Sequence, residues 1–185
     1  IGANIKECVE AMFGQFKVAY SLNRYEELEK RSSDIILLLD RYEVPEEALF
    51  KVRIYRALML ESIRIGDIEA AKKWISELRE LEKSVSEPYP MSMLKSALGY
   101  YEDTMGNYSE AIEEYKKAIS LAGTSDSTDR SLRFRIQIYN NLGVSYKNLG
   151  MLEEAKKEYQ KTLNLIYDLR EGGAKYEADA FINIG

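Results

Sequence analysis

The sequence predicts an all-α fold, an α-α superhelix built from antiparallel helix pairs. Apolar residues recur at spacings of three and four over long spans, which is the pattern of amphipathic helices. The 185 residues include only three prolines, and we find no convincing strand pattern. One arrangement of leucine, glycine, alanine and aromatic residues also repeats along the chain, which is typical of stacked helical repeats.

The repeat is seen by aligning Gly66, Gly106 and Gly150, which are spaced by 40 and then 44 residues. A leucine precedes each glycine by eight residues, and an alanine follows it by five. The residue after each leucine is Met59, Gly99 or Gly143, and the residue four after each alanine is Ile75, Tyr115 or Tyr159.

Each copy of this pattern predicts two helices joined by a short turn. Glycine inside the first helix lets its partner approach closely, and the second glycine ends that helix because it tolerates a left-handed conformation. We expect Asp67 to cap the helix that follows it. Asn23 with Glu26, and Asn107 with Glu110, are each expected to form a cap with an acidic third residue. Three tyrosines occupy packing positions and are expected in the core: Tyr115, Tyr146 and Tyr159.

The copies differ in completeness along the chain. A degenerate first copy has Asn23 in the glycine position, and a fifth begins at the end, where residues 181–185 match residues 139–143. Residues 84–90 and 123–129 are the expected links. We therefore expect one domain over residues 1–185, with about four helix pairs and the first helix of a fifth. Because the pattern stops at its glycine, a fragment of a longer chain is expected.

The fourth copy resembles a tetratricopeptide repeat (TPR). It supplies the family pattern at Tyr139, Leu142, Gly143, Tyr146, Gly150, Ala155 and Tyr159. The third copy departs from the pattern at Glu102, where tyrosine is expected, and the second keeps little more than Leu58, Gly66 and Ala71. The family unit is usually 34 residues, so these units are long. In length they resemble bacterial peptide-pheromone receptors of the Rap and PlcR type, and kinesin light chains.

The resemblance implies a non-enzymatic scaffold for protein–protein interaction or peptide binding. Members of the family stack into a superhelix whose first helices line a concave groove, and an extended peptide or a partner's helix binds there. The alternative is a peptide-sensing regulatory domain of a bacterial signalling or transcription regulator. Such a domain closes around a short peptide and acts through an output domain outside these residues.

The residues expected to face the groove lie on each first helix, away from the Leu-Gly stripe. In the second copy they are Arg53, Arg56, Leu60, Ile63 and Arg64. In the third they are Met93, Ser96, Tyr100 and Asp103. In the fourth and fifth they are Gln137, Asn140, Asn141, Val144, Lys147, Asn148 and Asn183.

Asn141 and Asn183 are the most specific of these predictions. In groove-binding members an asparagine just before the Leu-Gly pair holds the ligand backbone, and an amide can pair with both C=O and N–H groups. The alternative is an asparagine tolerated on an exposed helix face. For Arg53, Arg56 and Arg64, the alternatives are an acidic ligand or ligand C-terminus and a solvated face with local ion pairs.

The composition excludes several chemistries. The chain has no histidine, so histidine-based triads and zinc sites are impossible. Its single cysteine, Cys8, cannot form an internal disulfide and is expected to be a small buried residue. We therefore expect no catalytic residues, no metal and no cofactor.

The net charge and the hydropathy of the sequence limit the kinds of partner that we expect. The net charge of −5 argues against direct nucleic-acid contact and against an anionic membrane surface. The longest apolar run, residues 35–39, is far short of the roughly 20 residues that span a bilayer. The expected partner is a protein or peptide in the cytoplasm, and the unpaired C-terminal helix suggests a possible homo-oligomer.

Overall fold

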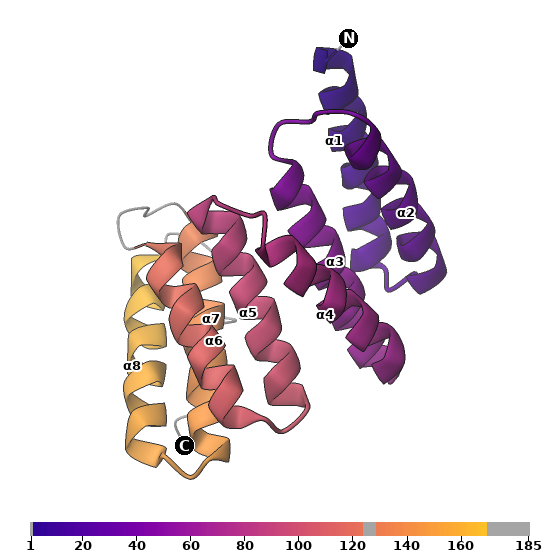
Figure 1. Cartoon of the computed structure of the whole chain (residues 1–185). Coiled ribbons are helices and arrows are strands. Elements are labelled where there is room, and N and C mark those ends of the chain that lie inside the picture. Colours follow the sequence, from indigo (N-terminus) through magenta and orange to yellow (C-terminus); the bar gives the residue numbers. More distant parts are fainter. Residues whose placement is uncertain (1, 124–128, 170–185) are drawn as a thin grey trace. The chain divides into compact units, whose positions relative to one another are not determined.

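The computed structural model describes residues 2–123 and 129–169, which form helices and no strand. The all-α prediction is therefore confirmed for these residues. The described helices are α1 (Gly2–Ser21), α2 (Tyr25–Arg41), α3 (Glu47–Ile65), α4 (Ile68–Glu82), α5 (Pro88–Thr104), α6 (Tyr108–Ala122), α7 (Asp129–Asn148) and α8 (Leu152–Asp168). Consecutive helices form antiparallel pairs, as Figure 1 shows.

The chain divides into two compact units, Ile1–Val85 and Ser86–Gly185. The first unit contains the pairs α1/α2 and α3/α4, and the second contains α5/α6 and α7/α8. These four pairs correspond to the first four copies of the repeat. A single domain over residues 1–185 stays a prediction, and the fifth copy, with Asn183, lies outside the described residues.

The glycine at the end of each first helix has the expected left-handed backbone. Its φ is +82° at Gly66 and Gly106 and +77° at Gly150. Asn23 occupies the same position in the first copy with φ +54°, a conformation that asparagine adopts more readily than most residues. The degenerate first copy therefore keeps the turn geometry of the others.

A tyrosine of each second helix in the second unit lies against a glycine of the first helix. A Cβ atom added to Gly99 would lie 2.8 Å from Cδ1 of Tyr115, and one added to Gly143 would lie 2.7 Å from Cδ1 of Tyr159. Both tyrosines are fully buried. This confirms that glycine permits the close approach of the two helices and that these tyrosines belong to the core.

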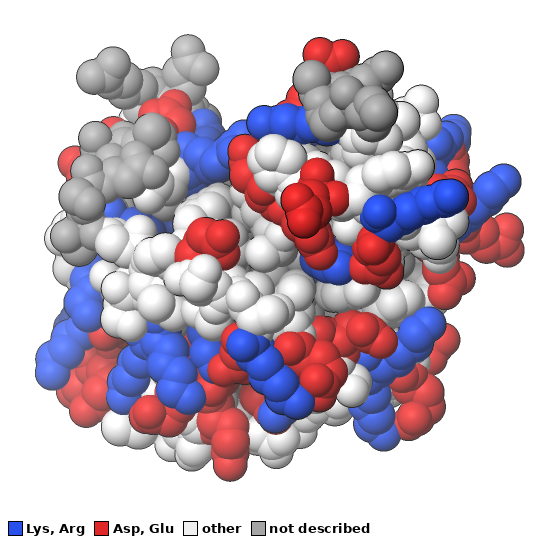
Figure 2. All heavy atoms as spheres, turned by 45° about the horizontal axis from the view of Figure 1, so that its top comes forward, with Lys and Arg blue, Asp and Glu red and all other residues white. Residues whose placement is uncertain are grey.

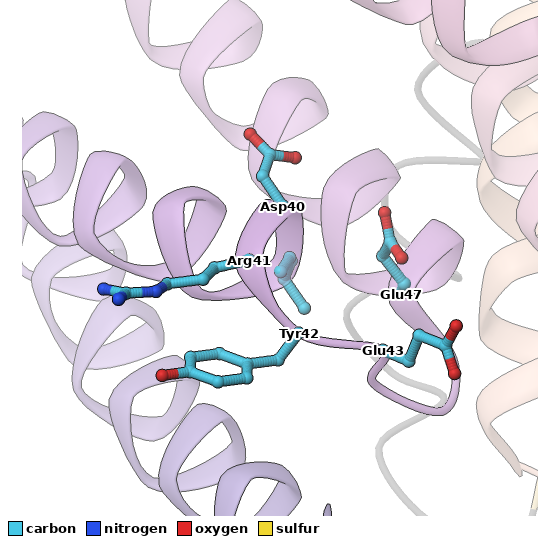
Figure 3. A pocket seen from close by; sticks show the side chains of 6 residues that line it. Asp40, Arg41, Tyr42, Glu43 and Glu47 are labelled. Atoms are coloured by element: carbon cyan, nitrogen blue, oxygen red, sulfur yellow. The ribbon is translucent and has the colours of Figure 1, made fainter.

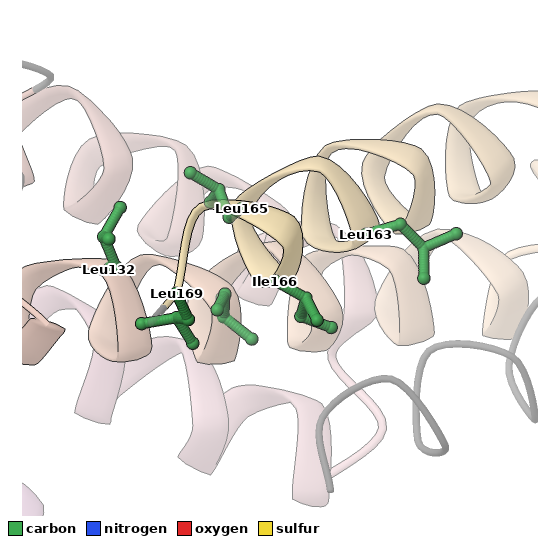
Figure 4. Packing of buried hydrophobic residues seen from close by; sticks show 6 residues of the cluster. Leu132, Leu163, Leu165, Ile166 and Leu169 are labelled. Carbon is green, nitrogen blue, oxygen red and sulfur yellow. The ribbon is translucent and has the colours of Figure 1, made fainter. Parts of the chain in front are cut away.

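Aromatic and aliphatic contacts complete the two cores. In the first unit, the ring of Phe13 stacks on Phe16 and meets Phe50 edge-on, each with centroids 5.2 Å apart. In the second unit, an aliphatic cluster closes one end of the α7/α8 pair (Figure 4). Its residues are Leu132, Ile136, Leu163, Leu165, Ile166 and Leu169. Each unit thus has buried contacts that hold its first helices in place.

The predictions for helix starts were confirmed at one position and wrong at three. Arg24, and not Asn23, precedes the first residue of α2, and no side chain caps that helix. Asp67 caps α4, since its Oδ1 accepts a hydrogen bond from the Ala70 amide at 2.9 Å. Asn107 does not cap α6 with its side chain. Its Nδ2 donates instead to Glu102 Oε2 at 2.8 Å, a charged acceptor that binds the amide more strongly. The link expected at residues 84–90 is shorter, because α5 begins at Pro88 and proline is compatible with a first helical turn.

Cys8 was expected to be buried, and this prediction was wrong. Its side chain is exposed, and Sγ lies 3.9 Å from the sulfur of Met12. The buried face of α1 is formed by Val9, Phe13 and Phe16, and Cys8 lies outside that apolar stripe. Small size alone therefore did not determine its burial.

Candidate functional site

The residues predicted to form the groove lie on first helices in both units. Arg53 and Arg56 are on α3 in the first unit. In the second unit, Tyr100 is on α5, and α7 carries Gln137, Asn140, Asn141, Lys147 and Asn148. The candidate residues therefore form two groups, one in each unit.

One face of α7 carries a row of polar side chains. Gln137, Asn141, Val144 and Asn148 follow each other at spacings of four, three and four, which places them along one helix face. Gln137 and Asn148 are exposed, and Asn141 is partly buried. We call the three amides Gln137, Asn141 and Asn148 the amide row. Asn140 and Lys147 flank it, the first partly buried and the second exposed.

Helices α5 and α7 run alongside each other in the second unit. Near their starts, the ring of Tyr89 meets that of Phe134 edge-on, with centroids 5.8 Å apart. Near their ends, Ser145 Oγ donates a hydrogen bond to Asp103 Oδ1 at 2.5 Å. Asp103 thus lies beside α7 at the level of Ser145, which is one turn from both Asn141 and Asn148.

The close packing of α5 against its neighbours corrects part of the groove prediction. Met93 and Ser96 were expected on the accessible face of α5, but Met93 is only 7% exposed and Ser96 only 3%. They lie in the first half of α5, between the two contacts with α7 just described. Tyr100 and Asp103, in the second half, remain partly exposed. The accessible part of α5 is therefore shorter than the repeat pattern predicted.

Burial raises the pKa of two side chains in the second unit, Asp103 and Tyr159. It raises the pKa of the Asp103 carboxyl, although the hydrogen bond from Ser145 opposes that shift. Burial also raises the pKa of the Tyr159 hydroxyl to about 12, and the charge of Asp103 adds to this effect. The Tyr159 hydroxyl is buried without a hydrogen-bond partner among the described residues.

The arginines of α3 are already engaged within the first unit. The guanidinium of Arg53 lies over the ring of Phe13, 5.5 Å from its centroid. Arg64 donates to Glu61 from Nε at 2.8 Å. For Arg64 the structure favours the local ion pair over a contact with an acidic ligand.

A cavity of about 290 Å³ in the first unit was not expected from the sequence. It lies where α2 ends and the chain turns into α3 (Figure 3). Lys51 bridges two of the side chains that line it, binding Asp40 at 2.7 Å and Glu47 at 2.6 Å. The remaining lining residues are Leu39, Arg41, Tyr42 and Glu43. No sequence motif marks these residues, because they come together only at a helix end.

Charges of both signs are intermixed on the face that Figure 2 shows. Figure 2 shows lysines and arginines alternating with aspartates and glutamates on the face in view, without a broad area of one sign. Within the described ranges, no group of three or more histidine, cysteine, aspartate or glutamate residues is placed to hold a metal ion. None of the described helices has the length and apolar character needed to cross a membrane.

The fold and its repeated helix pairs define an all-α helical-repeat protein. A family model described as the tetratricopeptide repeat matches residues 95–124 and 136–168. These segments cover most of the two helix pairs of the second unit. The second unit therefore carries two matches to the tetratricopeptide repeat, a kind of repeat that serves as a protein–protein interaction scaffold.

Solved structures that resemble the chain include two with known names. BtubC (BKLC) from P. vanneervenii has a TM-score of 0.73 at 16% identity, covering 97% of this chain and 71% of its own. This likeness shows the fold alone. The MamA protein has a TM-score of 0.48 at 23% identity, covering 95% of this chain and 87% of its own. No match was found among curated protein sequences.

Proposed function

We propose that the chain binds an extended peptide or protein segment along the accessible faces of α5 and α7, without catalysing a reaction. The observation that carries this proposal is the amide row on α7. Each amide offers a donor and an acceptor, so the row matches the alternating C=O and N–H groups of an extended backbone. Tyr100 on α5 adds an amphipathic ring that can pack on a ligand side chain.

The amides are not explained by the stability of α7. Asparagine is a weak helix former, roughly 0.7 kcal/mol less favourable than alanine at an interior position. The apolar face opposite the row, with Ile138 and Leu142 buried, is sufficient to dock α7 in the unit. A binding role gives these side chains a reason to be there that folding does not.

The proposal is tested by selecting ligands from a displayed library of random peptides. We expect the full chain to enrich a family of sequences. The best peptide should bind Asn141→Ala/Asn148→Ala at least about tenfold more weakly, because two backbone contacts are lost.

The matched control is Gln160→Ala/Asn164→Ala, which removes two exposed amides one turn apart on the second helix α8. It should bind like the wild type. Circular dichroism must first show that the wild type and both double variants are folded. If all three then bind the peptide with equal affinity, the amide row is not part of the binding site.

A further inference from the structure

We propose that Asp103, Ser145 and Tyr159 form a subsite in the second unit that receives the cationic side chain of a lysine or arginine in the bound peptide. The inference rests on the proposed function, and it names the residue type that the same face selects. We refer to these three residues as the Asp103 subsite.

Asp103 has no cationic partner, unlike three other buried or partly buried carboxylates of the described residues. Glu61 binds Arg64 at 2.8 Å, Glu114 binds Lys117 at 2.6 Å and Glu158 binds Lys161 at 2.8 Å. Within residues 2–123 and 129–169, no lysine or arginine forms an ion pair with Asp103, and its hydrogen-bond partner is the Ser145 hydroxyl.

The cation nearest in sequence to Ser145 does not fill this role. Lys147 lies two residues after Ser145 on α7, and residues two apart point to different helix faces. Its side chain is exposed. Ser145 occupies one oxygen of the carboxylate, which leaves the other oxygen available to an ammonium or guanidinium group in a charge-assisted hydrogen bond.

A second observation points to a missing ligand group. The Tyr159 residue is only 1% exposed, yet its hydroxyl has no hydrogen-bond partner among the described residues. The ring reaches past Gly143, where an added Cβ would lie 2.7 Å away, and the hydroxyl is close enough for the charge of Asp103 to act on it. A buried hydroxyl without a partner is unfavourable. A cationic group at Asp103 has several N–H donors for the carboxylate, and its charge would offset the negative charge that acts on this hydroxyl.

The test uses the full chain and peptides enriched from the random display library. We expect these peptides to share a lysine or arginine at one position. Replacing that lysine with norleucine, which keeps the methylene chain and removes the charge, should weaken wild-type binding about tenfold. Asp103→Asn should bind both peptides equally, and the control Asp168→Asn, which removes an exposed charge from α8, should discriminate like the wild type.

The outcomes separate this inference from the proposed function. Enriched peptides without a shared basic position, or an Asp103→Asn protein that still prefers lysine, overturn the subsite while peptide binding stands. No enrichment by the wild-type chain overturns both. If Asp103→Asn does not fold, Tyr159→Phe serves as the second variant, since it removes one oxygen and keeps the ring. It should reduce the preference for lysine about threefold, and an unchanged preference contradicts the subsite.

Discussion

Single residues set the distance between paired helices. In the third and fourth copies, a glycine on the first helix faces a tyrosine on the second. In the second copy the same positions hold Met59 and Ile75, both buried. The larger residue has moved to the first helix and the smaller one to the second. Volume is thus exchanged across the pair, as expected for interiors packed at near-crystalline density.

Gly143→Ala is therefore expected to destabilise the chain by about 1–3 kcal/mol, since the added methyl group overlaps the ring of Tyr159. Urea unfolding measures this loss. Gly14→Ala is the control, because a Cβ there meets nothing within 4 Å, and it should stabilise α1 by about 0.5–1 kcal/mol. Unchanged stability of Gly143→Ala would contradict the packing described above.

The raised pKa of Asp103 predicts a pH dependence. Burial raises its folded-state pKa above the ordinary value of 3.8, so the folded protein holds this proton more tightly than the unfolded chain does. The contribution of Asp103 to stability therefore falls as pH rises through the interval above 3.8, and stays low at neutral pH. Asp103→Asn lacks this loss, so it should gain stability relative to wild type as pH rises toward neutrality. Thermal melts of both proteins across this range test it, and a constant difference between them contradicts it.

At the scale of helices, the starts of the second helices differ in how they are stabilised. Asp67 caps α4 with a hydrogen bond to the Ala70 amide, whereas Asn107 binds the Glu102 side chain. We expect Asp67→Ala to cost about 1 kcal/mol. Asn107→Ala should cost less than about 0.5 kcal/mol, since exposed side-chain pairs contribute little. Chemical denaturation distinguishes the two, and equal losses would contradict the assigned roles.

The features that the sequence predicted well are local ones. Left-handed glycines, the Asp67 cap and the helix pairs follow from backbone preferences and short spacings. The bond between Ser145 and Asp103, which joins residues 42 apart, depends on how consecutive first helices pack, and no motif encodes it. The same packing buried Met93 and Ser96, which the repeat pattern alone placed on the accessible face. The wrong cap at Asn107 arose because a competing acceptor came from the preceding helix.

At the scale of the whole molecule, scaffold and sensor make different predictions. A scaffold with a preformed binding face should keep its radius of gyration when an enriched peptide saturates it. A sensor that closes around its ligand should become more compact, because the ligand selects the closed state. Small-angle scattering with and without peptide distinguishes them. We expect no change for the scaffold proposed here, and clear compaction would favour the regulatory alternative.

The most direct test of the central claim is to follow the side-chain amide signals of the ¹⁵N-labelled chain by NMR during titration with the best enriched peptide. We predict that the signals of Gln137, Asn141 and Asn148 shift in a saturable manner, while those of Gln160 and Asn164 on α8 do not. Shifts confined to α8, or saturable binding that leaves all three amides of the row unchanged, would contradict the claim that this face of α7 binds the peptide.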